Sequence, residues 1–166
     1  MVSLEELLLS RDNRRQLQVQ LLSEFKDKTL ICLTVVMPGN VKRNGNSLLV
    51  AKAAKEELLK VFDGHIIYMQ DKDLQTGYEF YLITDFNNIE AKKLCCGIEE
   101  THPLGRLFDI DVLDRDCIPI NREQVGYGKR KCLLCDNEAR FCMRNFTHTQ
   151  EEIQQHINEM IAEFKI

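Results

Sequence analysis

The segment Phe108–Val112 constrains the fold of this chain more than any other, because its residues alternate between apolar and acidic. Alternation with a period of two is typical of a β-strand with one buried face. The three apolar residues of the segment are therefore predicted to face a core. Asp109 and Asp111 are predicted to share the opposite face, with Cα atoms about 6.6 Å apart.

This pair of carboxylates, and the residues just before it, are candidates for chemistry. Two carboxylates on one strand face can bind one or two divalent cations, and Mg²⁺ takes a few carboxylates while water and substrate phosphates complete its shell. Pro103 and Gly105 interrupt the helix predicted before the strand, and Arg106 then stands where it could meet an anion. His102 could be a phosphate ligand or a general base, or a turn histidine bonded to backbone groups. A solvated edge strand would also carry Asp-x-Asp, but the Gly-Arg lead-in and the apolar, β-rich strand favour a catalytic site.

Length and composition limit the classes to which the chain can belong. With 166 residues, 44% of them hydrophobic, one domain with a real core is expected over residues 1–166. No apolar run reaches the length of a membrane span, and the N-terminus lacks the basic region of a secretory signal, so we expect a cytoplasmic protein without a membrane partner. Seven cysteines, an odd number, favour metal ligation or free thiols over a disulfide framework. A net charge of −4 argues against a general nucleic-acid binder but allows a local basic pocket.

Hydrophobic periodicity and capping residues predict alternating helices and strands along the chain. Together these elements predict an α/β or α+β domain with a mixed sheet and flanking helices. The predicted helices are Leu4–Phe25 (with Ser3 as N-cap and a leucine stripe), Ser47–Phe62, Asn87–Thr101 and Gln150–Phe164, and the predicted strands are Thr29–Met37, His65–Gln70, Tyr78–Thr84, Phe108–Val112 and Cys117–Arg122.

The loop after the first predicted strand could bind phosphate. Asn40–Gly45 carries Lys42 and Arg43 between a buried strand and a helix, which is where α/β folds bind phosphates. It is not a Walker A loop, because the glycine spacing and the Lys-Ser/Thr pair are absent. Gly77, at the start of a later strand, could bring backbone N–H groups to a ligand or could simply form a turn.

Basic residues gather at two other places. Arg11, Arg14 and Arg15 are spaced to share one face of the first helix, either as a solvated face or as the lining of a pocket or carrier-docking surface. The densest basic run surrounds Arg130, between Lys129 and Lys131.

Three cysteines and a histidine within residues 130–148 have the spacing of metal ligands. Cys132, Cys135, Cys142 and His148 form a Cys₃His set that opens with Cys-x₂-Cys, as structural zinc sites do. The other interpretation is that the cysteines are small buried hydrophobic residues in a reducing compartment.

These motifs together resemble the apo-citrate lyase phosphoribosyl-dephospho-CoA transferases, the holo-acyl-carrier-protein synthases of citrate lyase. The resemblance covers nearly the whole chain. It rests on HPLGRLFDIDV at His102–Val112, on the block Arg130-Lys131-Cys132-Leu133-Leu134-Cys135 followed by Cys142, Arg144 and His148, and on Arg11-Asp12-Asn13-Arg14, Pro38-Gly39 with Lys42, and Thr76-Gly77.

The resemblance implies a nucleotidyltransferase-like fold with paired aspartates on a central strand. It also implies transfer of the 2′-(5″-phosphoribosyl)-3′-dephospho-CoA group from its triphosphoribosyl donor, 2′-(5″-triphosphoribosyl)-3′-dephospho-CoA, to a serine of the citrate lyase acyl carrier protein (the gamma subunit), with release of diphosphate. Positioning and charge neutralisation dominate such transfers. The expected roles are Mg²⁺ or Mn²⁺ ligation by Asp109 and Asp111, anion binding by Arg106, Lys42, Arg43, Arg130, Arg14 and Gly77, and general-base catalysis by an aspartate or His102.

Three other functions remain open at this point. A malonate decarboxylase-type holo-synthase would use the same donor, although the chain length and the Cys-Leu-Leu-Cys block favour the citrate lyase type. Another metal-dependent nucleotidyltransferase, acting on a small molecule or RNA, is the second. The third is a non-catalytic zinc-binding interaction module in which the aspartates are surface residues.

Overall fold

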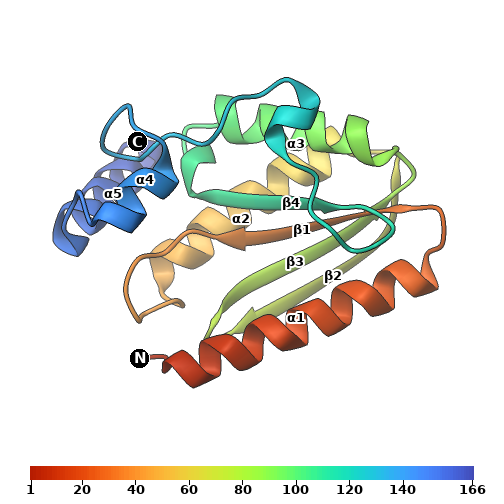
Figure 1. Cartoon of the computed structure of the whole chain (residues 1–166), viewed down its shortest axis with the longest axis horizontal. Helices are drawn as coiled ribbons and strands as arrows, with labels where there is room; N and C mark the ends of the chain where they lie inside the picture. The colour runs from red at the N-terminus through yellow and green to blue at the C-terminus, as the bar shows by residue number, and fades with distance from the viewer.

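A four-stranded sheet forms the middle layer of the molecule in a computed structural model that describes residues 1–166 (Figure 1). The strand order is β2-β3-β1-β4, and every neighbouring pair is antiparallel. The α+β class predicted from the sequence is confirmed, but the predicted mixing of parallel and antiparallel pairs is wrong. The strands are β1 (Thr29–Val35), β2 (Ile66–Leu74), β3 (Gly77–Thr84) and β4 (Phe108–Leu113).

The sheet is antiparallel because each helix-linked pair of strands is split by a third strand. α2 (Gly45–Val61) links β1 to β2, and α3 (Asn88–Thr101) links β3 to β4. β3 lies between β1 and β2, while β1 lies between β3 and β4. The strands of each linked pair therefore run parallel without touching, a split β-α-β arrangement. A β-α-β pattern in the sequence does not reveal that another strand is inserted.

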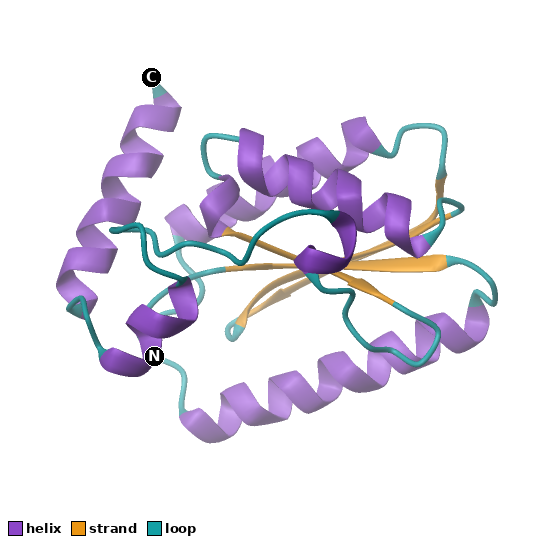
Figure 2. Cartoon of the chain, turned by 45° about the horizontal axis from the view of Figure 1, so that its top comes forward, coloured by secondary structure: helices purple, strands orange, loops and turns teal.

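The two faces of the sheet meet different layers (Figures 1 and 2). On one face, α2, α3 and α5 (Gln150–Lys165) contribute to a core of 22 buried residues, which includes Phe108, Ile110 and Val112 of β4. On the other face α1 (Leu4–Glu24) crosses the strands alone, over a core of seven buried residues. The alternation predicted for β4 is confirmed, because Asp109 and Asp111 point toward the α1 side.

α1 is attached to the sheet mainly by polar groups in its N-terminal half. The predicted leucine stripe is wrong there: Leu4 is 72% exposed and Leu8 49%, whereas Leu21 near the other end is 2% exposed. The Ser10 and Thr76 hydroxyl oxygens lie 2.8 Å apart, and an ion pair follows one turn further along the helix. A polar layer therefore separates this half of α1 from the sheet.

Three predicted boundaries differ from the structure. The strand predicted to end at Gln70 continues to Leu74, and in this added part Asp71 pairs with Lys55 and Asp73 with Arg43. Cys117–Arg122 forms only an isolated bridge from Leu113 to Pro119, followed by a 3-10 turn. A short helix, α4 (Ala139–Asn145), was not predicted, since it follows closely spaced cysteines without a capping side chain. None of the helices combines the length and apolar character needed to cross a bilayer.

Candidate active site

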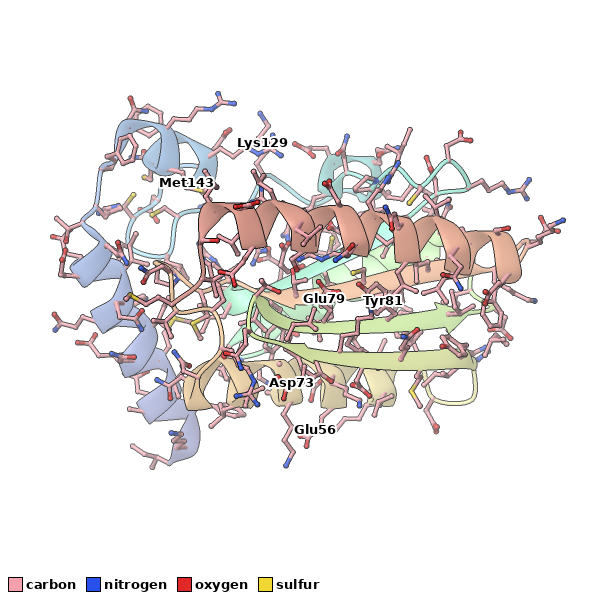
Figure 3. The ribbon with its side chains drawn as sticks, turned by 90° about the horizontal axis from the view of Figure 1, so that it is seen from below. Glu56, Asp73, Glu79, Tyr81, Lys129 and Met143 are labelled. Atoms are coloured by element: carbon pink, nitrogen blue, oxygen red, sulfur yellow. The ribbon has the colours of Figure 1, made fainter.

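The aspartates of β4 belong to a polar strip that crosses three strands beneath α1. Asp111 lies beside Cys32 of β1, and Asp109 lies beside Thr34, whose hydroxyl donates to Asp109 Oδ2 at 3.2 Å. Tyr81 of β3 lies on the far side of Cys32. Figure 3 shows Glu79 and Tyr81 on this face of the sheet, next to α1.

The two carboxylates have different surroundings. The Asp109 side chain is 50% exposed, and its Oδ1 lies 3.9 Å from Arg130 Nη1. Asp111 is more buried, and its carboxylate has neither a hydrogen bond nor an ion pair. Burial and the nearby charge of Asp109 raise the pKa of Asp111. A partly buried carboxylate without a partner, next to a second carboxylate, suits a bound divalent cation.

Arg14 reaches the strip from α1 and is held by a buried carboxylate. Its Nε donates to Glu79 Oε1 at 2.9 Å, and the Tyr81 hydroxyl donates to the other oxygen of Glu79. Burial acts to lower the pKa of Arg14, but the hydrogen bond and charge of Glu79 raise it. The guanidinium therefore stays charged close to the aspartates. Glu79 and Tyr81 were missed in the sequence, although a lone glutamate in an apolar strand was a visible signal.

The loop after β1 adds a further cation at the same end of the sheet. Lys42 Nζ donates to the Met37 carbonyl at 2.6 Å. Burial and the neighbouring charge of Arg11 lower the pKa of Lys42. Gly77 begins β3 at this end with a φ of +126°, a conformation that favours glycine. The structure thus brings Lys42, Arg14, Arg130 and Gly77 to the end of the sheet that carries Asp109.

Arg106 and Arg43 have other partners. The Arg106 guanidinium donates to the carbonyls of Lys131 and Cys132, so it holds a neighbouring loop. Arg43 makes two bonds to Asp73, at 2.7 and 2.8 Å, on the α2 side of the edge strand. Neither guanidinium is grouped with the aspartates.

His102 lies on the opposite side of β4 from the aspartates. Its ring packs against Phe108 and Phe164, with centroids 4.8 and 5.4 Å apart. Its Nδ1 accepts a hydrogen bond from the Leu104 N–H at 3.0 Å. Burial lowers the pKa of His102. These contacts correspond to the turn histidine that was the alternative interpretation.

Side chains from α3 fix the strand that carries the aspartates. β4 is an edge strand, and the outward backbone groups of Ile110 would lack partners. Glu99 Oε1 accepts from the Ile110 N–H at 3.0 Å, and Lys92 Nζ donates to the Ile110 carbonyl at 3.2 Å. Both charged residues are buried, and their spacing of seven places them on the core-facing side of the helix. That spacing was the signal available in the sequence.

The four predicted zinc ligands come together beside this site. The ligand atoms of Cys132, Cys135, Cys142 and His148 all lie within 4.8 Å of one another. The sulfur atoms of Cys135 and Cys142 are 3.4 Å apart. His148 Nε2 is a buried nitrogen with no hydrogen-bond partner in the structure. The cluster therefore has the donor set of a structural metal site.

Comparison with known proteins identifies the family of this chain. Residues 2–164 match the family model of the apo-citrate lyase phosphoribosyl-dephospho-CoA transferases. A Streptococcus pyogenes serotype M18 protein named as a probable member is 33% identical over 170 residues, covering 98% of this chain and 87% of its own length. A probable member from Vibrio cholerae is 35% identical over 167 residues, covering 98% and 93%. Protein CitXG of Haemophilus influenzae is 33% identical over 162 residues, which are 96% of this chain and 35% of that protein. The chain described here therefore belongs to the apo-citrate lyase phosphoribosyl-dephospho-CoA transferase family.

Proposed function

We propose that the polar strip around Asp109 and Asp111 transfers the phosphoribosyl-dephospho-CoA group to a serine of the citrate lyase acyl carrier protein, its gamma subunit. The serine oxygen attacks the α-phosphorus of the triphosphoribosyl donor and forms an O–P bond. The bond between that phosphorus and the bridging oxygen breaks, and diphosphate leaves with the electron pair. The observation that carries this proposal is the aspartate pair on β4, in which Asp111 has no partner, surrounded by basic side chains from three elements.

Asp109 and Asp111 are the residues that would hold Mg²⁺ or Mn²⁺. Their side chains share the open face of one strand, and the repulsion that raises the pKa of Asp111 is the kind that a cation relieves. When bound, the cation supplies charge stabilisation of the phosphoryl oxygens. An aspartate of the pair that is not occupied by the cation is the candidate base for the serine proton. His102 packs against Phe108 on the other face of β4, which favours an aspartate over His102 for this role.

Arg14, Lys42 and Arg130 are the proposed anion-binding groups. Arginine forks match phosphate oxygens, and the hydrogen bond to Glu79 holds the Arg14 side chain over the sheet. These three side chains would contact the donor from α1, from the loop after β1 and from the segment around Arg130.

All seven cysteines are free, which fits a reducing compartment such as the cytoplasm.

We further propose that the Cys₃His cluster binds one zinc ion. The donor set is that of structural zinc, and His148 Nε2 lacks any other partner. The Leu134 N–H points at the Cys132 sulfur, 3.4 Å away. Burial acts to raise the pKa of Cys132, but hydrogen bonds from the backbone N–H groups of Leu134 and Cys135 and from the neighbouring cysteine thiols together lower it.

Intact mass spectrometry of the carrier tests the activity. The protein is incubated with Mg²⁺, the triphosphoribosyl donor and the apo-carrier of either citrate lyase or malonate decarboxylase. We expect the citrate lyase carrier to gain the mass of the phosphoribosyl-dephospho-CoA group while diphosphate appears, and a carrier with the acceptor serine changed to alanine to stay unmodified. Modification of the malonate decarboxylase carrier alone would identify the other synthase, and two unmodified carriers would contradict the proposal.

A further inference from the structure

We propose that the metal-binding segment 130–148, called here the knuckle, positions Arg130 beside Asp109. Zinc bound in the knuckle would then raise kcat of the transfer through Arg130, without contacting the substrates. This inference rests on the proposed function, because it assigns Arg130 to the departing diphosphate. It is carried by a set of contacts that join the knuckle to the start of β4.

Two arginines hold the knuckle and β4 together in both directions. Arg106, just before β4, donates to the carbonyls of Lys131 and Cys132, the latter at 2.5 Å. Arg130, in the knuckle, donates in return to the carbonyls of Arg106 and Gly105, at 2.9 and 3.4 Å. Each guanidinium satisfies backbone groups of the other segment. Movement of the knuckle would therefore be transmitted to Arg130.

The backbone of Arg130 belongs to a small hairpin that also carries the first metal ligand. The Ala139 N–H donates to the Arg130 carbonyl at 2.9 Å, and the Cys132 N–H donates to the Asn137 carbonyl at 2.7 Å. Lys131 and Glu138 form an isolated bridge between these two bonds. The position of the Arg130 backbone and that of Cys132 are therefore set by the same hairpin.

The knuckle has almost no apolar core of its own. Within residues 130–148, Cys132 and Cys142 are the buried residues, and both are proposed ligands. Its large apolar side chains point to solvent: Phe141 is 52% exposed, Met143 74% and Phe146 88% (Met143 is labelled in Figure 3). Burial of two cysteines cannot offset the conformational entropy of ordering such a segment. Metal binding can offset this entropy, because in small metal sites the free energy of metal binding contributes directly to the free energy of folding.

The consequence for catalysis follows from the place of Arg130. Its Nη1 lies 3.9 Å from Asp109 Oδ1, within reach of a phosphate bound at the aspartates. Charge on the leaving diphosphate grows as the bond breaks, so a well-placed arginine lowers the barrier more than it tightens donor binding. Loss of zinc should therefore lower kcat rather than raise KM, and by about 100-fold, the cost of a misplacement near 1 Å.

Three variants of the full chain test this inference, with His156→Ala as the matched control. His148→Ala removes a ligand, Arg106→Ala keeps all four ligands but breaks the connection, and Arg130→Ala removes the positioned group. His156 is a second histidine of the same region, on α5, outside the ligand set. The readouts are zinc per chain by elemental analysis, circular dichroism, amide hydrogen exchange of residues 105–109, and steady-state carrier modification.

We expect His148→Ala to lose zinc, Arg106→Ala to keep it, and both to exchange faster at residues 105–109. All three variants should lower kcat by a similar factor with little change in KM, and combining His148→Ala with Arg130→Ala should lower it no further. The control should match the wild type in every readout. The inference is overturned if zinc-free His148→Ala retains normal kcat, or if the double variant shows the product of the two losses. If His148→Ala does not fold, normal kcat in folded Arg106→Ala overturns it.

Failure of the proposed transferase function would give a different result from failure of this inference. In that case the wild-type protein would bind zinc and leave the carrier unmodified, and no variant could be slower.

Discussion

Asp111 is a charged residue whose surroundings disfavour its ionised form in the absence of a ligand. Its carboxylate is partly buried, it lies next to Asp109 on the same strand face, and it has no hydrogen bond to offset either cost. Proteins retain such unpaired charges mainly where a ligand or a reaction needs them. Cys32 and Thr34, on the next strand, supply only one hydroxyl to the pair. The unfavourable electrostatic free energy therefore lies at Asp111, and a bound cation would reduce it.

A pH dependence of stability follows from this carboxylate. Because folding raises the pKa of Asp111, the folded state prefers the protonated acid. The contribution of Asp111 to stability is thus most favourable below its unfolded pKa and is lost as the pH rises through its folded pKa. Asp111→Asn removes this loss, so in chelator the variant should have a higher melting temperature than the wild type at pH 7 and a smaller advantage at pH 4. Equal melting temperatures at both pH values would contradict the assignment of Asp111 as an unpaired, partly buried charge.

At the scale of elements, β4 is positioned by its connection to α3 and by side chains that cap its open edge. The turn between them passes so close to the end of α3 that a Cβ on Gly105 would overlap the Glu99 carbonyl oxygen and lie 2.7 Å from its carbon. Gly105 is needed there for close approach and not for a left-handed backbone. The same Glu99 holds the Ile110 N–H between the two aspartates.

A methyl group at this turn should therefore disturb the site from outside it. We expect Gly105→Ala to lower the free energy of unfolding by about 1–3 kcal/mol, the usual cost of overpacking, because backbone atoms must move to make room. Gly128→Ala is the control, since nothing lies within 4 Å of its added Cβ. Urea unfolding of both variants provides the measurement, and equal stability of the two would show that the turn can open at no cost.

Local signals predicted some elements well and others poorly. Ser3 caps α1 as predicted, in a reciprocal pair of hydrogen bonds with Glu6, because this cap depends only on residues three apart in the chain. The alternation of β4 was also readable, since strand periodicity and burial agree there. The burial of α1 could not be predicted from its leucine spacing. Its N-terminal half is held instead by polar contacts with Thr76 and Glu79, which are far away in sequence.

At the scale of the whole molecule, the site is built where segments distant in sequence meet at one end of the sheet. Arg14 arrives on α1, Lys42 in the loop after β1, and Arg130 through the knuckle, and no local pattern specifies their meeting. The sequence motifs identified these residues as candidates, and the split β-α-β topology decides which of them lie together. Arg43 and Arg106 were equally plausible by residue type, but Asp73 and the knuckle carbonyls take their guanidinium groups.

Charge removal at the aspartate pair tests the central claim most directly. Asp109→Asn and Asp111→Asn keep size and polarity but remove the charge proposed to hold the cation. Asp114→Asn, just after the same strand, is the control, because an asparagine oxygen can still accept the backbone bonds from Asp116 and Ile118. The measurement is the rate of carrier mass gain, in the presence of Mg²⁺, for folded samples of all three variants. We predict losses of about 100-fold or more for the first two, since metal charge stabilisation contributes several kcal/mol and each ~1.4 kcal/mol is tenfold in rate, and a near-normal rate for Asp114→Asn. Normal carrier modification by folded Asp109→Asn or Asp111→Asn would contradict the assignment of the active site.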